Sequence, residues 1–208
     1  STEEMVAVAT AAAKHGGFYM THVRDEADRS FDALQEAIAI GQRAHIPVQH
    51  SHIKLGTVSV WGKAADYVRV IDDARRNGLD ILADCYPYDA WYSTIKVLVP
   101  DKQYESPESV KAALDAVGGA GNVTIANFPA NKRYEQQTLA QLAENERVAP
   151  IDMFVRIIRE GNAANNDALI IAKSMTEADL EFFYKQPWVM VASDGGIDSQ
   201  HPRGAGTF

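Results

Sequence analysis

The sequence is poor in three features, each of which would point to a particular class of protein. Its 208 residues include one cysteine, Cys85, so no internal disulfide can form, and we expect a reducing compartment such as the cytoplasm. The apolar runs are far shorter than the ~20 residues of a membrane span, and acidic residues stand where a signal peptide is basic. Lysine and arginine number 20 against 28 acidic residues, for a net charge of -8. We therefore expect neither a membrane nor a nucleic-acid partner, because phosphate binding needs clustered basic side chains.

The sequence does contain a regular alternation of apolar and amphipathic stretches. Strand-like apolar runs occur at 18–23, 46–53, 79–88, 122–128, 168–175 and 188–196. Apolar residues at helical spacing predict helices at about 2–14, 30–44, 62–78, 138–161 (broken near Pro150) and 176–186. The segment at about 89–121 has mixed signals, and we predict that it forms a loop and a helix inserted into the domain.

This order of elements predicts an α/β fold with a parallel sheet. Strands and helices alternate in units of roughly 30 residues, which is typical of right-handed βαβ crossovers. In such sheets the chemistry lies at the carboxyl ends of the strands. His22, His52, the run "DCYPY" and Asp194 all fall at predicted strand ends.

Two histidines close strand-like runs in consecutive units, in "YMTHV" and "IPVQHSH". Neighbouring parallel strands lie ~4.8 Å apart, so His22 and His52 could share one metal ion, and zinc readily takes imidazole nitrogen. The alternative is that each is a hydrogen-bonded core or rim residue. His50 lies two residues before His52 and is expected on the same strand face, as a residue that supports the site or faces the substrate.

Other polar residues near the strand ends also suit a catalytic site. Asp194 in "VASDGG" could act as a general base towards a metal-activated water, or could simply form a turn before the two glycines. Tyr86 could orient a carboxylate or an oxyanion, or pack at the rim. Arg203 could clamp a carboxylate or lie at the surface. Cys85 is more simply interpreted as a small buried apolar residue than as a ligand.

The ordered set "THVRDE", "QHSHIK", "DCYPY" and "VASDGG…HPRGAGTF" resembles the D-aminoacylase (N-acyl-D-amino-acid deacylase) branch of the amidohydrolase superfamily. The resemblance implies a (β/α)8 barrel with one or two zinc ions. It assigns His22 to strand five, His52 to strand six and Asp194 to strand eight. It also implies that Lys54, with Tyr86 and Arg203, holds the carboxylate of the substrate.

The resemblance implies only part of such a barrel, about strands five to eight, over residues 1–208. No first-strand H-x-H motif precedes His22, and Cys85 follows the sixth-strand motif instead of preceding it. The missing half of the barrel, or another copy of the chain, would have to complete the fold.

We therefore expect a zinc-dependent hydrolase of the amide bond of N-acyl-D-amino acids, with little activity in this chain by itself. Two alternatives stay open. One is a cyclic-amide hydrolase of the dihydroorotase or hydantoinase type, which would normally carry a metal-bridging lysine. The other is a non-catalytic α/β binding domain with structural histidines.

Overall fold

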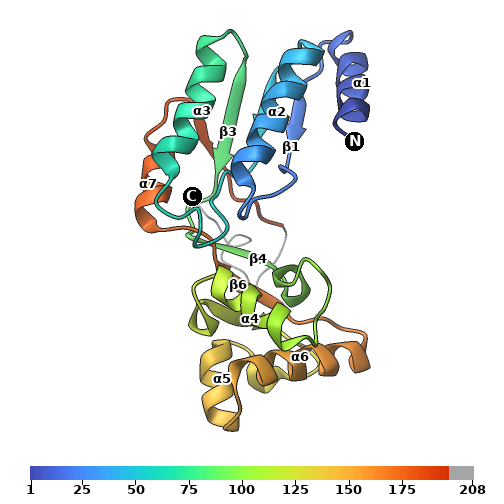
Figure 1. Ribbon diagram of the computed structural model, residues 1–208, viewed down its shortest axis with the longest axis vertical. Coiled ribbons are helices and arrows are strands. Elements are labelled where there is room, and N and C mark those ends of the chain that lie inside the picture. The colour runs from blue at the N-terminus through green and yellow to red at the C-terminus, as the bar shows by residue number, and fades with distance from the viewer. Residues whose placement is uncertain (197–208) are drawn as a thin grey trace. The chain divides into compact units, whose positions relative to one another are not determined.

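The computed structural model describes residues 1–196, which form two compact units (Figure 1). The first unit comprises residues 1–56, 60–89 and the part of the chain from Met175 onwards. The second comprises residues 57–59 and 90–174. The predicted insertion at about 89–121 falls in the second unit, together with the residues that follow it up to Ser174.

The first unit is built on a four-stranded parallel sheet in the order β1-β2-β3-β7. Its strands are β1 (Tyr19–Thr21), β2 (Val48–His50), β3 (Ile81–Cys85) and β7 (Val189–Val191). Its helices are α1 (Thr2–Ala13), α2 (Ser30–Ala44), α3 (Ala64–Arg76) and α7 (Glu177–Tyr184). The α/β class and the parallel sheet predicted from the sequence are therefore confirmed for this unit.

Helices cover one face of the parallel sheet. Leu34 of α2, Ile71 of α3 and Phe183 of α7 lie in one buried cluster with Val48 and Ile81 of the sheet. Alternating strand residues point to opposite faces, and the other face bounds a groove of about 420 Å³. Its lining includes Phe18, Met20, Gln49, Leu82, Met190 and Val191. Phe18, Met20, Met190 and Val191 are among the exposed large apolar side chains, so this face of the sheet is largely apolar and, as far as residues 1–196 are concerned, exposed.

The second unit is built on an antiparallel sheet in the order β4-β6-β5. Its strands are β4 (Ala90–Thr94), β5 (Val123–Asn127) and β6 (Leu169–Lys173). The helices are α4 (Pro107–Ala116), α5 (Leu139–Glu146) and α6 (Pro150–Ala164), with short 3-10 turns at Ile95–Leu98, Ala120–Asn122 and Lys132–Tyr134.

The expectation that all predicted strands join one parallel sheet is thus wrong for β5 and β6. Both pair antiparallel, and β6 also pairs with β4, a strand that the sequence did not indicate. Alternate apolar side chains of β5 and β6, namely Val123, Ile125, Ile170 and Ala172, are buried in the core of the second unit. Burial explains their apolar character whatever the direction of pairing.

No helix within residues 1–196 is long and apolar enough to cross a membrane.

Candidate metal centre

The register of the parallel sheet brings the two predicted histidines together. Thr21 of β1 lies opposite His50 of β2, so both strands end at the same edge of the sheet. His22 follows β1 directly, and His52 follows β2 after one residue. The predicted proximity of the two imidazoles at neighbouring strand ends is therefore confirmed.

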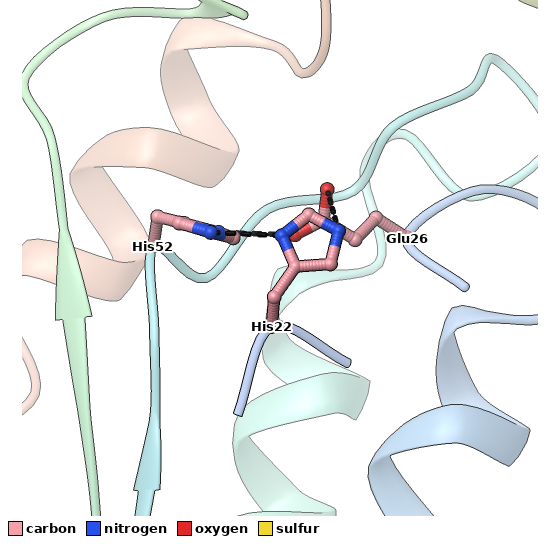
Figure 2. Close-up of side chains that lie close together, drawn as sticks. All are labelled: His22, Glu26 and His52. Carbon is pink, nitrogen blue, oxygen red and sulfur yellow. Dashed lines mark hydrogen bonds and ion pairs between the residues drawn. The ribbon is translucent and has the colours of Figure 1, made fainter. Parts of the chain in front are cut away.

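The two imidazoles are in direct contact. Nδ1 of His22 lies 2.9 Å from Nε2 of His52, and the ring centroids are 4.6 Å apart at an interplanar angle of 69° (Figure 2). His22 is mostly exposed, with 64% of its side chain accessible, whereas His52 is 13% exposed. The pair therefore has one ring anchored in the protein and one that faces solvent.

Glu26 is the third member of the cluster, and sequence reasoning missed it. Its Oε1 lies 3.0 Å from Nδ1 of His52, and its Oε2 lies 3.6 Å from Nε2 of His22. One donor atom from each of the three side chains lies within 4.8 Å of the other two. Glu26 sits in the segment between β1 and α2, where no periodicity marks it, and the only signal was its place in the charged run "HVRDE".

Lys54 completes the buried part of the cluster. Its Nζ lies 2.6 Å from Oε1 of Glu26 and 2.6 Å from Nδ1 of His52, and 4% of its side chain is exposed. Burial by itself would raise the pKa of Glu26. The hydrogen bond from His52 and the charges of Lys54 and the two histidines outweigh it and hold that pKa at about 2. Glu26 is therefore an ionised carboxylate that balances the buried ammonium.

The pKa of His22 is lowered overall, although the influences on it oppose one another. Burial lowers its pKa, and the charges of His52 and Lys54 lower it further, while those of Glu26 and Asp194 raise it. An imidazole that stays neutral keeps a lone pair for a cation.

Asp84 of β3 fixes the backbone at His52. Its Oδ1 accepts a hydrogen bond of 2.7 Å from the His52 backbone N–H, and its Oδ2 accepts one of 2.6 Å from the Gln49 side chain. His52 has a φ of 40°, a conformation that non-glycine residues adopt only when surrounding contacts hold it. The carboxylate on the neighbouring strand supplies such a contact.

The left-handed backbone conformation of His52 also separates its side chain from that of His50. The expectation that both histidines share one strand face is wrong, because β2 ends at His50 and the chain turns before His52. His50 is buried, with Nε2 2.9 Å from the hydroxyl of Tyr67 on α3. Burial lowers the pKa of His50 to about 4. The structure thus places His50 in the core and away from the contacts of the cluster.

Tyr86 and Cys85 lie beside the cluster without joining it. The ring of Tyr86 lies 5.4 Å from Nζ of Lys54, and its centroid is 6.5 Å from that of His52. Cys85 is fully buried, with Sγ 3.5 Å from the carbonyl of Tyr86, and burial raises the pKa of its thiol to about 12. A neutral, buried thiol agrees with the interpretation of Cys85 as a small apolar residue.

Asp194 follows β7 at the same sheet edge and has a φ of 48°. Its negative charge is the smallest of the influences described above on the pKa of His22, which it acts to raise. Arg203 lies outside the residues that the structure describes.

Gly56 allows the backbone of Glu26 to lie directly against the chain that follows β2. Its N–H donates a 2.6 Å hydrogen bond to the carbonyl of Glu26, and a Cβ at this position would lie 2.5 Å from that oxygen. We expect Gly56→Ala to displace the Glu26 backbone and to lower the free energy of unfolding by about 1–3 kcal/mol. Urea unfolding measures this effect, and Gly121→Ala is a useful comparison because nothing lies within 4 Å of its Cβ and its φ is not positive. Equal stability of Gly56→Ala and the unchanged protein would contradict the prediction.

The donors of the cluster suit a borderline metal ion. Imidazole nitrogen and carboxylate oxygen are both ordinary zinc ligands. The two facing imidazole nitrogens lie at hydrogen-bond distance, 2.9 Å, with a proton on one of them. A zinc ion bound to both, at about 2.0–2.1 Å from each nitrogen, would replace that proton and need the rings to separate slightly. On its donor chemistry, the site therefore fits a zinc ion.

Comparison with known proteins gives relatives of one kind. No family model matches the chain. The chain is 25% identical over 199 residues to an N-acyl-D-glutamate deacylase of Alcaligenes xylosoxydans xylosoxydans, covering 96% of this chain and 36% of the relative. It is 34% identical over 96 residues to a D-aminoacylase of the same organism, covering 46% of this chain and 20% of the relative. The chain thus spans about a third or less of the length of these relatives.

Solved structures agree with these relatives. An N-acyl-D-glutamate deacylase from Bordetella bronchiseptica, complexed with zinc and a phosphonate inhibitor, matches 94% of this chain with a TM-score of 0.73 at 23% identity, which shows the fold. A D-aminoacylase matches 94% of this chain with a TM-score of 0.70 at 25% identity. The match covers 36% of each of these longer chains. The predicted resemblance is thereby confirmed: over most of its length, this chain is similar to the D-aminoacylase family of amidohydrolases.

Proposed function

We propose that this chain carries a zinc site and the catalytic carboxylate of an amidohydrolase that cleaves the amide bond of N-acyl-D-amino acids. The contact between His22 and His52 at adjacent strand ends, with Glu26 beside them, is the observation that carries the proposal. The relatives support it, since they are named as deacylases of N-acyl-D-amino acids, and one was solved with zinc. His22 and His52 would hold one zinc ion, and a second ion is possible because a D-aminoacylase has a binuclear metal centre.

The bound ion would polarise the amide carbonyl and lower the pKa of the attacking water towards about 7. Asp194 would accept the proton of that water and then deliver it to the departing amino nitrogen. The ammonium of Lys54 lies at the same site and would attract the α-carboxylate of the substrate. The ring of Tyr86 lies 5.4 Å from the ammonium of Lys54, and with Arg203 it remains a predicted substrate-binding residue. His50, buried against Tyr67, would support the site and would not face the substrate.

We further propose that β1, β2, β3 and β7 are strands five to eight of a (β/α)8 barrel. This assignment places His22 on strand five, His52 on strand six and Asp194 on strand eight. The apolar sheet face with Met20 and Met190 exposed would then be the interior of the barrel, which is packed with side chains in such folds. The remaining strands of a longer polypeptide would cover that face, and another copy of the chain is the alternative.

Two other functions compete with this proposal. A cyclic-amide hydrolase would use a similar metal site, but the named relatives favour open-chain N-acyl-D-amino acids. In a non-catalytic binding domain, no reaction would require the imidazoles of His22 and His52 to lie in contact. The buried free thiol of Cys85 fits the cytoplasmic location that forms part of this proposal.

We expect the complete barrel, loaded with zinc, to hydrolyse N-acetyl-D-methionine, and the 208-residue chain by itself to show little or no turnover. Asp194→Asn should lower the rate by about 10²–10⁴-fold, the usual contribution of general acid–base catalysis. N-acetyl-L-methionine and a cyclic imide serve as control substrates. Preferential cleavage of the cyclic imide, or full activity of Asp194→Asn, would refute the assignment.

A further inference from the structure

The peptide group between Ser51 and His52 lies just beyond the end of β2 and carries the imidazole that contacts His22. The φ of His52, 40°, describes the rotation between this peptide group and the rest of the residue. It therefore relates the plane of the peptide to the direction of the Cα–Cβ bond of His52. That direction brings the ring of His52 to the ring of His22, with centroids 4.6 Å apart (Figure 2). Contacts that fix this peptide group thus help to place the His52 side chain.

Both polar groups of this peptide are hydrogen-bonded to side chains. The N–H of His52 donates to Oδ1 of Asp84 at 2.7 Å. The carbonyl oxygen of Ser51 lies 3.2 Å from Nδ1 of His50. Because a carbonyl oxygen only accepts, Nδ1 of His50 carries the hydrogen and donates it. In a planar trans peptide the N–H and C=O bonds point in opposite directions, so the two side chains hold the group at opposite edges.

Tyr67 of α3 holds the ring of His50 in the orientation that this contact requires. With the hydrogen on Nδ1, Nε2 of the neutral ring is an acceptor, and the hydroxyl of Tyr67 lies 2.9 Å from it. His50 is 1% exposed and Tyr67 is fully buried, so solvent water does not compete for these contacts. The ring of Tyr67 itself packs against Phe31 and Phe183, at centroid distances of 5.1 and 6.1 Å. A chain of hydrogen bonds thus connects the packed core to the peptide before His52.

We propose that His50 is a positioning residue that, together with Asp84, clamps the Ser51–His52 peptide and so sets the direction of the His52 side chain. The left-handed conformation of His52 is unfavourable for a residue with a Cβ and persists only where contacts hold it. On the other side of His52, the N–H of Ile53 donates to the carbonyl of Asp84 at 2.8 Å. His52 is therefore held on both sides of its Cα, and His50 supplies the restraint at the carbonyl of the first peptide. The role of His52 as a metal ligand rests on the proposed function, whereas the clamp does not.

Two substitutions at position 50 separate the roles of the two ring nitrogens. The side-chain amide of asparagine reaches the place of Nδ1 and can still donate to the carbonyl of Ser51. The side-chain amide of glutamine reaches the place of Nε2, where it can bond to Tyr67 but not to that carbonyl. Both variants put an amide in the same buried place, so each is the control for the other. We expect His50→Gln to weaken the clamp and His50→Asn to retain it.

Hydrogen exchange of the His52 backbone amide in the metal-free chain measures the clamp directly. We expect exchange to be about 10-fold faster in His50→Gln, the equivalent of about one hydrogen bond, and to change less than about 2-fold in His50→Asn. The amide of Ala83 in β3, which donates to the carbonyl of Trp188, is the internal reference for a general loss of stability. NOE cross-peaks between the rings of His22 and His52 should weaken in His50→Gln and persist in His50→Asn.

Zinc affinity, measured in competition with a chelator, tests the consequence for the proposed metal site. We expect His50→Gln to bind zinc about 10-fold more weakly, as is usual when a group that supports a ligand histidine is lost, and His50→Asn to bind it as tightly as the unchanged chain. Tyr67→Phe should act in the same direction as His50→Gln, because the ring of His50 loses its anchor. Tyr134→Phe is the matched control, since its buried hydroxyl lies 3.2 Å from Glu160 in the second unit, and it should not change zinc affinity.

The outcomes separate this inference from the proposed function. Equal acceleration of exchange at His52 and Ala83 in His50→Gln, or equal effects of His50→Asn and His50→Gln, would overturn the clamp, because His50 would then act only through stability. Zinc binding that requires both His22 and His52 but is unchanged in His50→Gln would also overturn the positioning role. Zinc binding that requires neither of these two histidines would refute the proposed metal site, and the exchange of the His52 amide would then decide the clamp by itself.

Discussion

Replacing both His22 and His52 with alanine should remove zinc from the purified chain and weaken its zinc affinity by more than about 100-fold. Groups that only hydrogen-bond a ligand already contribute about 10–100-fold, so losing two ligands should cost more. The donor set within 4.8 Å would shrink from three side chains to Glu26, which already accepts a hydrogen bond from Lys54. Metal content after purification and a chelator titration measure the effect.

His15→Ala is the matched control for this experiment. His15 is exposed just beyond the end of α1, and the same substitution there removes an imidazole without touching the cluster. The control should retain the zinc content of the unchanged chain. If the double variant at His22 and His52 also retains its zinc, the non-catalytic alternative is favoured. The contact between the two imidazoles would then not mark the zinc site.

The sequence predicted the elements of the first unit because their signals are local. The helix expected at 30–44 has the bounds of α2, since its apolar residues recur at helical spacing and its buried face matches them. The proximity of His22 and His52 followed from a rule of topology, because parallel strands joined by helices end at one edge of the sheet. Neither prediction needed knowledge of long-range contacts.

The features that the sequence did not reveal depend on contacts between distant residues. The antiparallel pairing of β5 with β6 leaves the same apolar pattern as parallel pairing would. Glu26 lies in an irregular segment, and its role emerges only from contacts with His52 and Lys54, 26 and 28 residues further along. The positive φ of His52, which separates it from His50, depends on a hydrogen bond to Asp84 of another strand.

The largest loss of stability should come from replacing Asp179, a buried carboxylate of α7 with no part in the metal centre. Its oxygens accept hydrogen bonds from the backbone N–H groups of Gly62 and Ala64, at 2.8 and 3.1 Å, just before and at the start of α3. They also accept a 2.6 Å hydrogen bond from the hydroxyl of Thr176, which caps α7. One side chain thus joins the beginnings of two helices, and its contact with Ala64 spans 115 residues of the chain.

We expect Asp179→Ala to lower the free energy of unfolding by about 3–5 kcal/mol, because each buried donor left without an acceptor costs about 1–3 kcal/mol. Asp179 is 3% exposed, so water cannot readily replace the lost oxygens. Urea unfolding measures the change, and Asp179→Asn, which retains one acceptor oxygen, should lose less. Glu181→Ala on the same helix removes only an exposed ion pair with Lys185 and should change the stability by about 0.5 kcal/mol or less. A loss below about 1 kcal/mol in Asp179→Ala would show that the starts of α3 and α7 are held by packing instead of by this carboxylate.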